Sequence, residues 1–548
     1  MKLWFGQTNG FIVILTGSLI MKKRQGLALI VMTGLLFLTV NSLTAADKKK
    51  ASQPAPSPAV TVFNVIDYGA KGDGKTLDSQ AINKAIEAAA AEGGGTVFFP
   101  AGTYLSTSIR MKSNIALYLD QGSTILAASA ADRYKYDPPE PNVWGDSLQY
   151  QDFGHSHWHN SLIWGENLQN ISILGPGTIY GKGLVRGTGN APEGSGNKAI
   201  AFKWCRNVIM RDFSILMGGW FGILATGVDN LTIDNLKIDT NRDGMDIDCC
   251  INVRVSNCSV NSPRDDGICL KSSYGLGIAR ATENVTITNC FVSGFTEGTL
   301  LDGTYKRNEQ TAGGNGPTGR IKFGTESNGG FKNITISNCN FEFCRGLALE
   351  AVDGAILEDV AITNITMRDI VNAPIFVRLG ERMRGPANAP VGEIRRIIIS
   401  DITVYNADPK HGVIISGDKG HDIRDLRLSN IRIYYKGGGT SEQAAREVPG
   451  FEKEYPEPYR FGIMPSYGFF IRNVDGIQLN NVEVSFNQAD MRPAFYLDDV
   501  KNAEFLFVKA QKQEGVPSLS LRNVLNLNLF RSLDLSDGKI EKAVNDNL

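Results

Sequence analysis

The amino-acid sequence predicts an all-β fold: a single-stranded right-handed parallel β-helix, which is a solenoid, with a capping helix at its N-terminal end. The main observation is a recurring nine-residue phrase that alternates apolar and polar residues, as strands do. Several copies start about 22 to 26 residues after the one before, and longer gaps fit one turn plus an inserted loop. Short strands at such a period, without helices between them, are typical of a solenoid. The copies begin at Asn207, Asn230, Asn252, Asn284, Asn333, Asp359, Arg396, Asp425 and Gly476.

A short polar residue stands five positions into every copy of the phrase. Stacked coils lie about 4.8 Å apart, so these residues are predicted to form a column. Asn tolerates the left-handed turn conformation that such a position needs. The members are Asp212, Asn235, Asn257, Asn289, Asn338, Asn364, Asp401, Asn430 and Asn481. The next position is apolar in most copies, and in three it is Cys258, Cys290 or Cys339, which we expect to be buried core thiols rather than a disulfide framework.

The N-terminal region is typical of a secreted protein. Residues 1–46 are predicted to form a signal peptide, with Met21 as the true initiator, because Lys22 to Arg24 precede an apolar run and a cleavage site near Ala45 or Ala46. Residues 47–59 read as a flexible linker, and residues 60–548 as one β-helix domain. The sequence therefore predicts a secreted or periplasmic location, with no membrane span in the mature form.

The composition limits the partners of the chain. It has 548 residues, a formal net charge of −1 and 42% hydrophobic residues, which is an ordinary globular composition. Lys and Arg do not exceed Asp and Glu, so no nucleic-acid partner is expected. Any anionic ligand must be held by local positive charge.

The segment from Val62 to Tyr104 opens the solenoid. Ser79 to Ala91 is amphipathic and predicts a helix, capped by Asp78 or Thr76. A helix over the first coil would prevent end-to-end association. The segment resembles the start of the pectin-degrading β-helix superfamily, which implies the fold and says little about the chemistry.

Two neighbouring coils are unusually acidic. One reads DTNRDGMDID, with Asp243, and the next reads SPRDDGICLKSS, with Asp265 and Asp266. Asp243 and Asp265 each lie 13 residues after their phrase starts, so counting predicts one shared phase on adjacent coils. Gathered carboxylates raise one another's pKa, which suits acid–base hydrolysis and predicts catalytic roles for all three. The alternatives are a calcium site on a loop or a structural ladder of Asp.

The motifs carry a resemblance to a known family. NRDG, RDDG and Arg320-Ile321-Lys322 are similar to the N-x-D, D-D and R-I-K motifs of the polygalacturonases, glycoside hydrolase family 28, over roughly Val62 to Val500. The resemblance implies inverting hydrolysis of α-linked galacturonic acid in pectic polysaccharide, without a cofactor or metal. It assigns Asp265 as the general acid, and Asp243 and Asp266 as the groups that activate water.

Two departures bear on the type of enzyme. The family's G-H-G histidine is missing, since the corresponding coil has Phe295-Thr296-Glu297. Counting coils also puts the family's R-x-K where this chain has Ala348-Leu349-Glu350. Both departures fit an exo-acting or backbone-variant member better than an endo-polygalacturonase, including one that cuts rhamnogalacturonan.

Further residues are predicted to contact the substrate from their place in the motifs or beside them. Three of the five histidines, His155, His157 and His159, stand within HSHWHN, and alternate His157 and His159 would face one side of a strand. The predicted substrate-binding residues are Asn241, Lys271, Arg320, Lys322, Glu326, Glu350, His157 and His159. The inserted segments 299–320 and 434–467 are expected to wall off one end of the groove, which favours exo action.

Two other functions stay open. A lyase of the same fold would use calcium and a Lys or Arg base. A non-catalytic β-helix would only bind glycans, and the intact NRDG and RDDG motifs argue against it. The sequence leaves the exact substrate and the oligomeric state undetermined.

Overall fold

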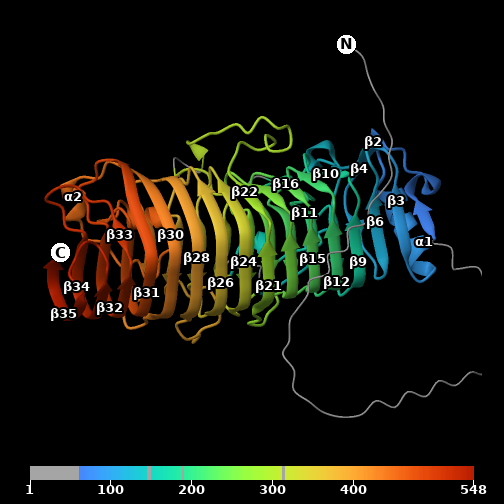
Figure 1. The fold of residues 1–548 in the computed structure, drawn as a ribbon. Coiled ribbons are helices and arrows are strands. Elements are labelled where there is room, and N and C mark those ends of the chain that lie inside the picture. The colour runs from blue at the N-terminus through green and yellow to red at the C-terminus, as the bar shows by residue number, and fades with distance from the viewer. Residues whose placement is uncertain (1–60, 145–149, 188–190, 312–314) are drawn as a thin grey trace, which may run out of the picture. The chain divides into compact units, whose positions relative to one another are not determined.

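The computed structural model describes residues 61–144, 150–187, 191–311 and 315–548 (Figure 1). The compact unit runs from Val60 to Leu548. The predicted signal peptide, 1–46, and the linker, 47–59, lie outside the described residues. Among the described residues, no helix is both long and apolar enough to cross a membrane.

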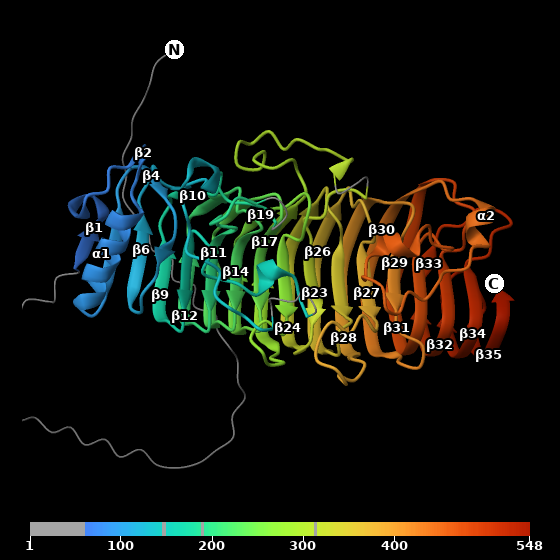
Figure 2. The same cartoon turned by 180° about the vertical axis from the view of Figure 1, so that it is seen from behind.

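The unit is a parallel β-helix, as predicted, in which three strands per turn stack on those of the next turn to form three columns (Figures 1 and 2). The first column begins with β1 (Val62–Asn64), β3 (Gly95–Phe99), β6 (Ile115–Leu119), β9 (Gln169–Leu174), β12 (Arg206–Arg211), β15 (Asp229–Asp234), β18 (Ile251–Ser256) and β21 (Thr282–Thr288). The second begins with β2 (Asp73–Leu77), β4 (Gly102–Ser106), β7 (Ser123–Ala127), β10 (Thr178–Tyr180), β13 (Ser214–Leu216), β16 (Lys237–Asp239), β19 (Ser259–Asn261) and β22 (Phe291–Ser293).

The third column carries the acidic motifs. It consists of β5 (Ile109–Arg110), β8 (Ile163–Glu166), β11 (Lys198–Lys203), β14 (Phe221–Thr226), β17 (Asp243–Asp248), β20 (Ile268–Ser272), β23 (Ile321–Ser327), β25 (Leu347–Ala351), β27 (Ile375–Leu379) and β29 (Val413–Ser416). From β14 to β29 every residue of this column is buried, whereas strands of the first column alternate between buried and exposed. Other segments therefore cover the outer side of the third column.

Later turns merge the columns into longer strands. The first two columns continue as β24 (Phe331–Glu342), β26 (Ile356–Arg368), β28 (Glu393–Ala407) and β30 (Ile423–Gly437), and β31 (Phe469–Gln488) joins all three. β32 (Phe495–Leu506), β33 (Lys509–Ala510) and β34 (Leu519–Phe530) follow, and β35 (Gly538–Asn547) closes the end antiparallel to β34.

The described helices are few and short. Helix α1 (Ser79–Ala91) lies at the N-terminal end (Figure 1), and it buries Ile82, Ala85 and Ile86 against the first coil. Asp78 is the residue before this helix, but its carboxylate accepts hydrogen bonds from the backbone of Lys71 and Gly72 at 2.7 and 3.0 Å rather than capping the helix. The others are α2 (Ser441–Ala444), α3 (Pro458–Phe461), η1 (Val65–Tyr68), η2 (Ala130–Asp132) and η3 (Phe153–His155).

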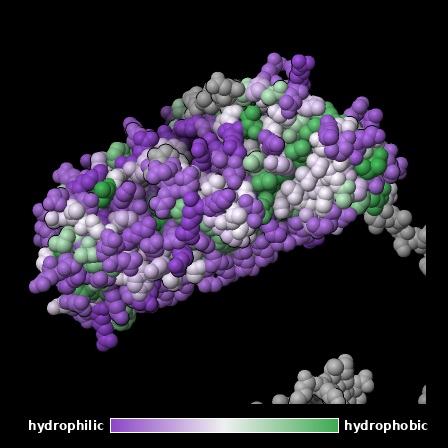
Figure 3. All heavy atoms as spheres, turned by 90° about the horizontal axis from the view of Figure 1, so that it is seen from above, coloured by the Kyte–Doolittle hydropathy of each residue, from purple (hydrophilic) through white to green (hydrophobic). Residues whose placement is uncertain are grey.

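The repeated polar position forms a surface column, as predicted. Its residues have positive φ, for example 54° at Asn235 and 56° at Asn338. The side-chain amide of Asn235 donates to Asp212 at 2.9 Å, and that of Asn481 donates to Asn430 at 2.9 Å. The following position points inward, and the three cysteines there are buried and free, as expected. Seen from above, the surface is mostly hydrophilic, with hydrophobic residues gathered toward the N-terminal end (Figure 3).

Candidate active site

Asp243 and Asp266 lie side by side at the start of adjacent strands of the third column. Met245 of β17 pairs with Ile268 of β20, a register that places Asp243 beside Asp266. One carboxylate oxygen of each lies within 4.8 Å of the other. The predicted shared phase of Asp243 and Asp265 is therefore wrong by one residue.

The reason is one extra residue in the turn before β20. Lys237 pairs with Ser259 in the second column, and Met245 pairs with Ile268 in the third. The later coil therefore has one more residue between these two pairs. Its turn pushes Asp265 outward, so that the Asp265 side chain is 27% exposed while Asp243 and Asp266 are buried.

The pKa values of the two buried carboxyl groups are shifted in opposite directions. Burial raises the pKa of Asp243 well above its usual range, and the negative charges of Asp246 and Asp265 raise it further. Burial would also raise the pKa of Asp266, but the charges of Lys322, Arg320 and Lys271 outweigh it and hold that pKa below its usual range. A neutral carboxyl beside an ionised one is the arrangement that acid–base hydrolysis uses.

Arg320 and Lys322 contact Asp266 from the next coil of the β-helix. Nε of Arg320 donates to Asp266 at 2.8 Å, and Nζ of Lys322 lies 3.3 Å from the other oxygen of Asp266. Arg320 also donates to Glu457 at 2.5 Å, and Lys322 lies 3.4 Å from Glu350. Both side chains are only 2% exposed.

These contacts change the expectation that Arg320, Lys322 and Glu350 grip the substrate. Their charged groups are buried and face one another or Asp266, because β23 stacks directly on β20 and β25 directly on β23. Arg320 and Lys322 belong to the coil next to Asp266, and Glu350 to the one after it, as the coil count indicated. Arg320 and Lys322 thus hold Asp266 ionised.

Glu350 provides a test of this buried network. Burial raises the pKa of Glu350 to about 7, although the charges of Lys322 and Arg320 act the other way. In an unfolded chain Glu titrates near pH 4.3, so the folded state gains stability from this proton below about pH 4.3 and loses it as the pH rises to about 7. Glu350→Gln removes the titration. We expect the Tm of Glu350→Gln minus that of the wild type to increase over this pH range in thermal melts, whereas a constant difference would contradict the buried state of Glu350.

A second buried group, around Lys271, lies farther along β20 and β23. Nζ of Lys271 donates to Glu326 at 2.9 Å and lies 3.9 Å from Asp246. Burial would raise the pKa of Glu326, but Lys271, His155 and Arg382 hold it well below its usual range. Lys271 and Glu326 were expected to contact the substrate, and the structure instead pairs them with each other beneath the surface.

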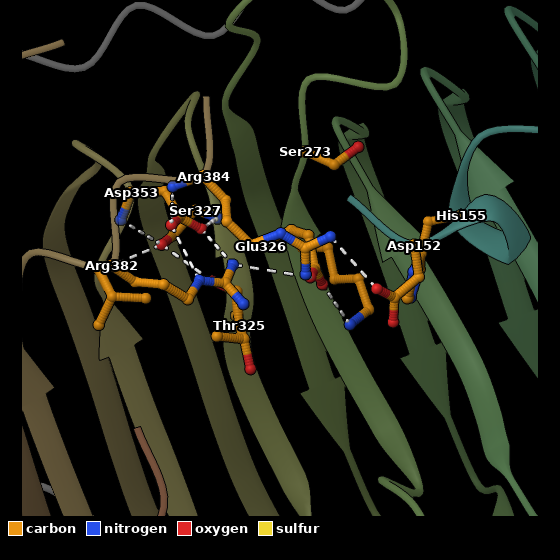
Figure 4. Close-up of polar contacts among 12 residues, drawn as sticks. Asp152, His155, Ser273, Thr325, Glu326, Ser327, Asp353, Arg382 and Arg384 are labelled. Carbon is orange, nitrogen blue, oxygen red and sulfur yellow. Dashed lines mark hydrogen bonds and ion pairs between the residues drawn. The ribbon is translucent and has the colours of Figure 1, made fainter. Parts of the chain in front are cut away.

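The outer side of this group is built from two segments distant in sequence. Arg384 contacts Asp152 at 3.2 Å and lies 3.9 Å from Glu326, while Arg382 pairs with Asp353 (Figure 4). The segment that contains Asp152 also brings His155 to within 3.1 Å of Asp246 in β17 (Figure 4). These contacts explain why the outer side of the column is buried.

Contrary to prediction, His157 and His159 do not face one side of a strand. Nε2 of His155, in η3, lies 3.1 Å from a carboxylate oxygen of Asp246, and both side chains are buried. His157 stacks on Phe153 instead, and Nε2 of His159 bonds Glu166 at 2.9 Å. The segment is not a strand, so alternate residues do not share a face.

Asn241 lies at the exposed rim of the acidic residues. Its side-chain amide donates to Glu297 at 3.5 Å, and Glu297 pairs with Arg186. Burial raises the pKa of Glu297. Glu297 occupies the coil where a histidine was expected, and sequence reasoning did not select it as a site residue. Its position in the coil where the histidine was expected could have identified Glu297 as a site residue.

Both inserted segments lie next to the site. Segment 434–467 packs Phe461 and Met464 against Phe376 and Phe470, on the outer side of later coils of the third column. It also brings Glu457 to Arg320, and it places Tyr455 with its hydroxyl 2.9 Å from that of Thr325.

Segment 299–320 runs along the corner where the second column turns into the third, and its arch stands above β22 in Figure 1. The carboxylate of Asp239 accepts hydrogen bonds from the backbone of Leu300 and Leu301 at 2.9 and 3.0 Å. Arg307 binds Glu342 and Asp369, each at 2.7 Å. The segment is therefore anchored to Asp239 on an earlier coil and to Glu342 and Asp369 on later coils.

Among the described residues, two groups of side chains could each offer three ligand atoms to a metal ion: His155, Asp243 and Asp246, or Asp243, Asp266 and Cys269. Lys271, Arg320 and Lys322 already lie against these carboxylates, so their positive charges would oppose a divalent cation. The donor sets therefore fit a metal poorly.

Comparisons with known proteins agree with the fold and the motifs. Residues 62–147 match the family model described as rhamnogalacturonase A/epimerase, pectate lyase-like, and residues 147–453 match that of glycosyl hydrolases family 28. Two solved structures are similar in fold. The family 28 exopolygalacturonase of Yersinia enterocolitica has a TM-score of 0.59 at 18% identity and covers 81% of this chain and 78% of its own. A hyperthermoactive exopolygalacturonase from Thermotoga maritima has a TM-score of 0.55 at 16% identity, covering 89% and 95%.

Curated relatives are similar in sequence over parts of the chain. A probable polygalacturonase of Vitis vinifera is 26% identical over 41% of this chain and 48% of its own length. An exo-poly-alpha-D-galacturonosidase of Dickeya chrysanthemi is 34% identical over 31% of this chain and 28% of its own length. The chain thus spans less than half of these two relatives. An exopolygalacturonase of Platanus acerifolia is 24% identical over 69% of this chain and 92% of its own.

Proposed function

The chain belongs to glycosyl hydrolases family 28, and from this premise we propose that it is a secreted hydrolase of α-galacturonosyl linkages in pectic polysaccharide, acting from a chain end with inversion. The observation that carries the proposal is the arrangement of Asp243, Asp265 and Asp266. A neutral and an ionised carboxyl lie side by side, and a third stands at the exposed rim.

Each carboxyl has a distinct role in the proposed reaction. Asp265, the exposed one, gives a proton to the leaving glycosidic oxygen. Asp266, held ionised by Arg320 and Lys322, takes a proton from the attacking water, and neutral Asp243 beside it orients that water. The hydroxide equivalent adds to the anomeric carbon on the face opposite the leaving group, which inverts the configuration.

Exo action is supported by the segment 434–467. It packs over the coils that follow the acidic residues, so the substrate meets protein on that side. A chain end then fits where an uninterrupted chain does not. The names of the relatives from Dickeya chrysanthemi and Platanus acerifolia agree with this mode.

Product sizing tests the proposal. Polygalacturonan and rhamnogalacturonan are incubated separately with the enzyme, and the products are separated at the earliest time points. We expect monomers or very short products from polygalacturonan from the start. An early series of long oligomers would show endo action and would refute the blocked end of the groove. Cleavage of rhamnogalacturonan alone would mean that rhamnogalacturonan, and not polygalacturonan, is the substrate.

The same digests distinguish a lyase. Hydrolysis by paired carboxylates needs no metal ion, so we expect activity to survive dialysis against a chelator. A lyase would form unsaturated products that absorb in the ultraviolet. Loss of activity on chelation with recovery on added calcium, together with such absorbance, would show that the enzyme is a lyase and not a hydrolase.

A further inference from the structure

The buried cations leave the recognition of substrate charge to another residue. Lys271, Arg320 and Lys322 are each at most 5% exposed in their side chains and pair with protein carboxylates. A uronate carboxylate therefore needs a cation nearer the surface.

Arg242 occupies that place. It follows Asn241 and directly precedes β17, at the position of the N-x-D motif that the family pattern leaves open. Its side chain is 31% exposed, and one of its terminal nitrogens lies 2.7 Å from Asp265. The guanidinium also lies over the ring of Trp220, 5.6 Å from the ring centre. The indole therefore packs against the guanidinium beside the exposed carboxyl.

The guanidinium has donor capacity to spare. Nε of Arg242 is buried and makes no hydrogen bond in the described chain. A guanidinium has five N–H donors and binds a carboxylate best through two parallel bonds. The ion pair with Asp265 uses one terminal nitrogen of Arg242. An incoming carboxylate can therefore compete for this group.

On the basis of the proposed function, we propose that Arg242 is the residue that recognises the uronate carboxylate of the substrate, and that it exchanges Asp265 for this carboxylate when the sugar binds. The exchange releases Asp265 from its ion pair and leaves its side chain available to the leaving glycosidic oxygen. Arg242 thereby links the charge of the substrate to the acid step.

The test separates binding from hydrolysis. Binding of galacturonic acid and of galactose is measured by calorimetry for the wild type, Arg242→Gln and Arg242→Lys. Hydrolysis of trigalacturonic acid and of its methyl ester is measured in parallel. The matched control is Arg395→Gln in β28, whose side chain is 30% exposed and pairs with Glu358 and Glu393 away from the site.

We expect Arg242→Gln to weaken galacturonic acid binding, and to lower kcat/KM for trigalacturonic acid, by about 10- to 100-fold, the effect of one lost charged hydrogen-bond partner. Galactose binding and the methyl ester change less than about 3-fold, because they carry no charge for a guanidinium. Arg242→Lys keeps the positive charge but cannot form two parallel hydrogen bonds with a carboxylate. We expect its losses to lie between those of the wild type and Arg242→Gln. Arg395→Gln behaves as the wild type.

Equal losses on charged and neutral ligands would overturn the inference, since Arg242 would then only shape the site. Unchanged binding of galacturonic acid in Arg242→Gln would overturn it as well. If the wild type binds galacturonic acid through Arg242 but hydrolyses neither trisaccharide, the proposed function fails while the recognition role of Arg242 holds.

Discussion

Replacement of Asp265 by Asn is expected to lower kcat on polygalacturonan by about 10²- to 10⁴-fold, the usual contribution of a general acid. The change keeps the size of the side chain and removes its proton donor. Asp265 is the only one of the three proposed catalytic carboxyls whose side chain is substantially exposed, so a leaving oxygen can reach it. Steady-state kinetics measure the effect, with KM changing little because the proton transfer occurs in the transition state.

The matched control is Asp229→Asn. Asp229 is 41% exposed and pairs with Arg280 at 2.8 Å, so the substitution breaks an Arg–Asp pair of similar geometry outside the site. We expect wild-type kcat for it. Near wild-type rates for both Asp265→Asn and Asp243→Asn would refute catalysis by these carboxyl groups.

Replacement of Arg320 by Ala is expected to destabilise the protein by about 3–5 kcal/mol, because it leaves buried carboxylates without their partner. Arg320 binds Asp266 at 2.8 Å and Glu457 at 2.5 Å, and it lies 3.8 Å from Glu350. Chemical denaturation measures the loss of stability.

The same variant decides between two roles of Arg320. A wild-type denaturation midpoint with a raised KM only for charged substrates would mean that Arg320 grips the uronate. The buried position of its guanidinium instead predicts a large loss of stability and a loss of kcat through Asp266. The control Arg424→Gln removes an exposed guanidinium paired with Glu393 and should leave the midpoint unchanged.

The fold followed from the sequence because a solenoid repeats one local pattern. The alternation within each phrase and the polar residue five positions after its start are local features, and stacking turns them into columns without any long-range information. Asn235 and Asn481 lie where the phrase count predicted. The opening helix also has the predicted bounds, Ser79–Ala91.

The site was less accessible to such counting. One extra residue in a turn moved the partner of Asp243 from Asp265 to Asp266, and a fixed count from the phrase start cannot detect it. Burial also depends on segments far away in sequence. His155 and Glu457 reach the site from segments that share no motif with it. Lys322 was predicted to contact the substrate because the sequence does not show that Asp266 and Glu350 surround it in space.

The stereochemistry of the first product tests the central claim most directly. Proton NMR of trigalacturonic acid in the presence of concentrated enzyme records the anomeric signals before mutarotation mixes them. Attack by a water between Asp243 and Asp266, opposite the leaving oxygen, predicts that the new reducing end appears first as the β anomer. The α anomer as first product, or a product with a double bond in the ring, would contradict the account.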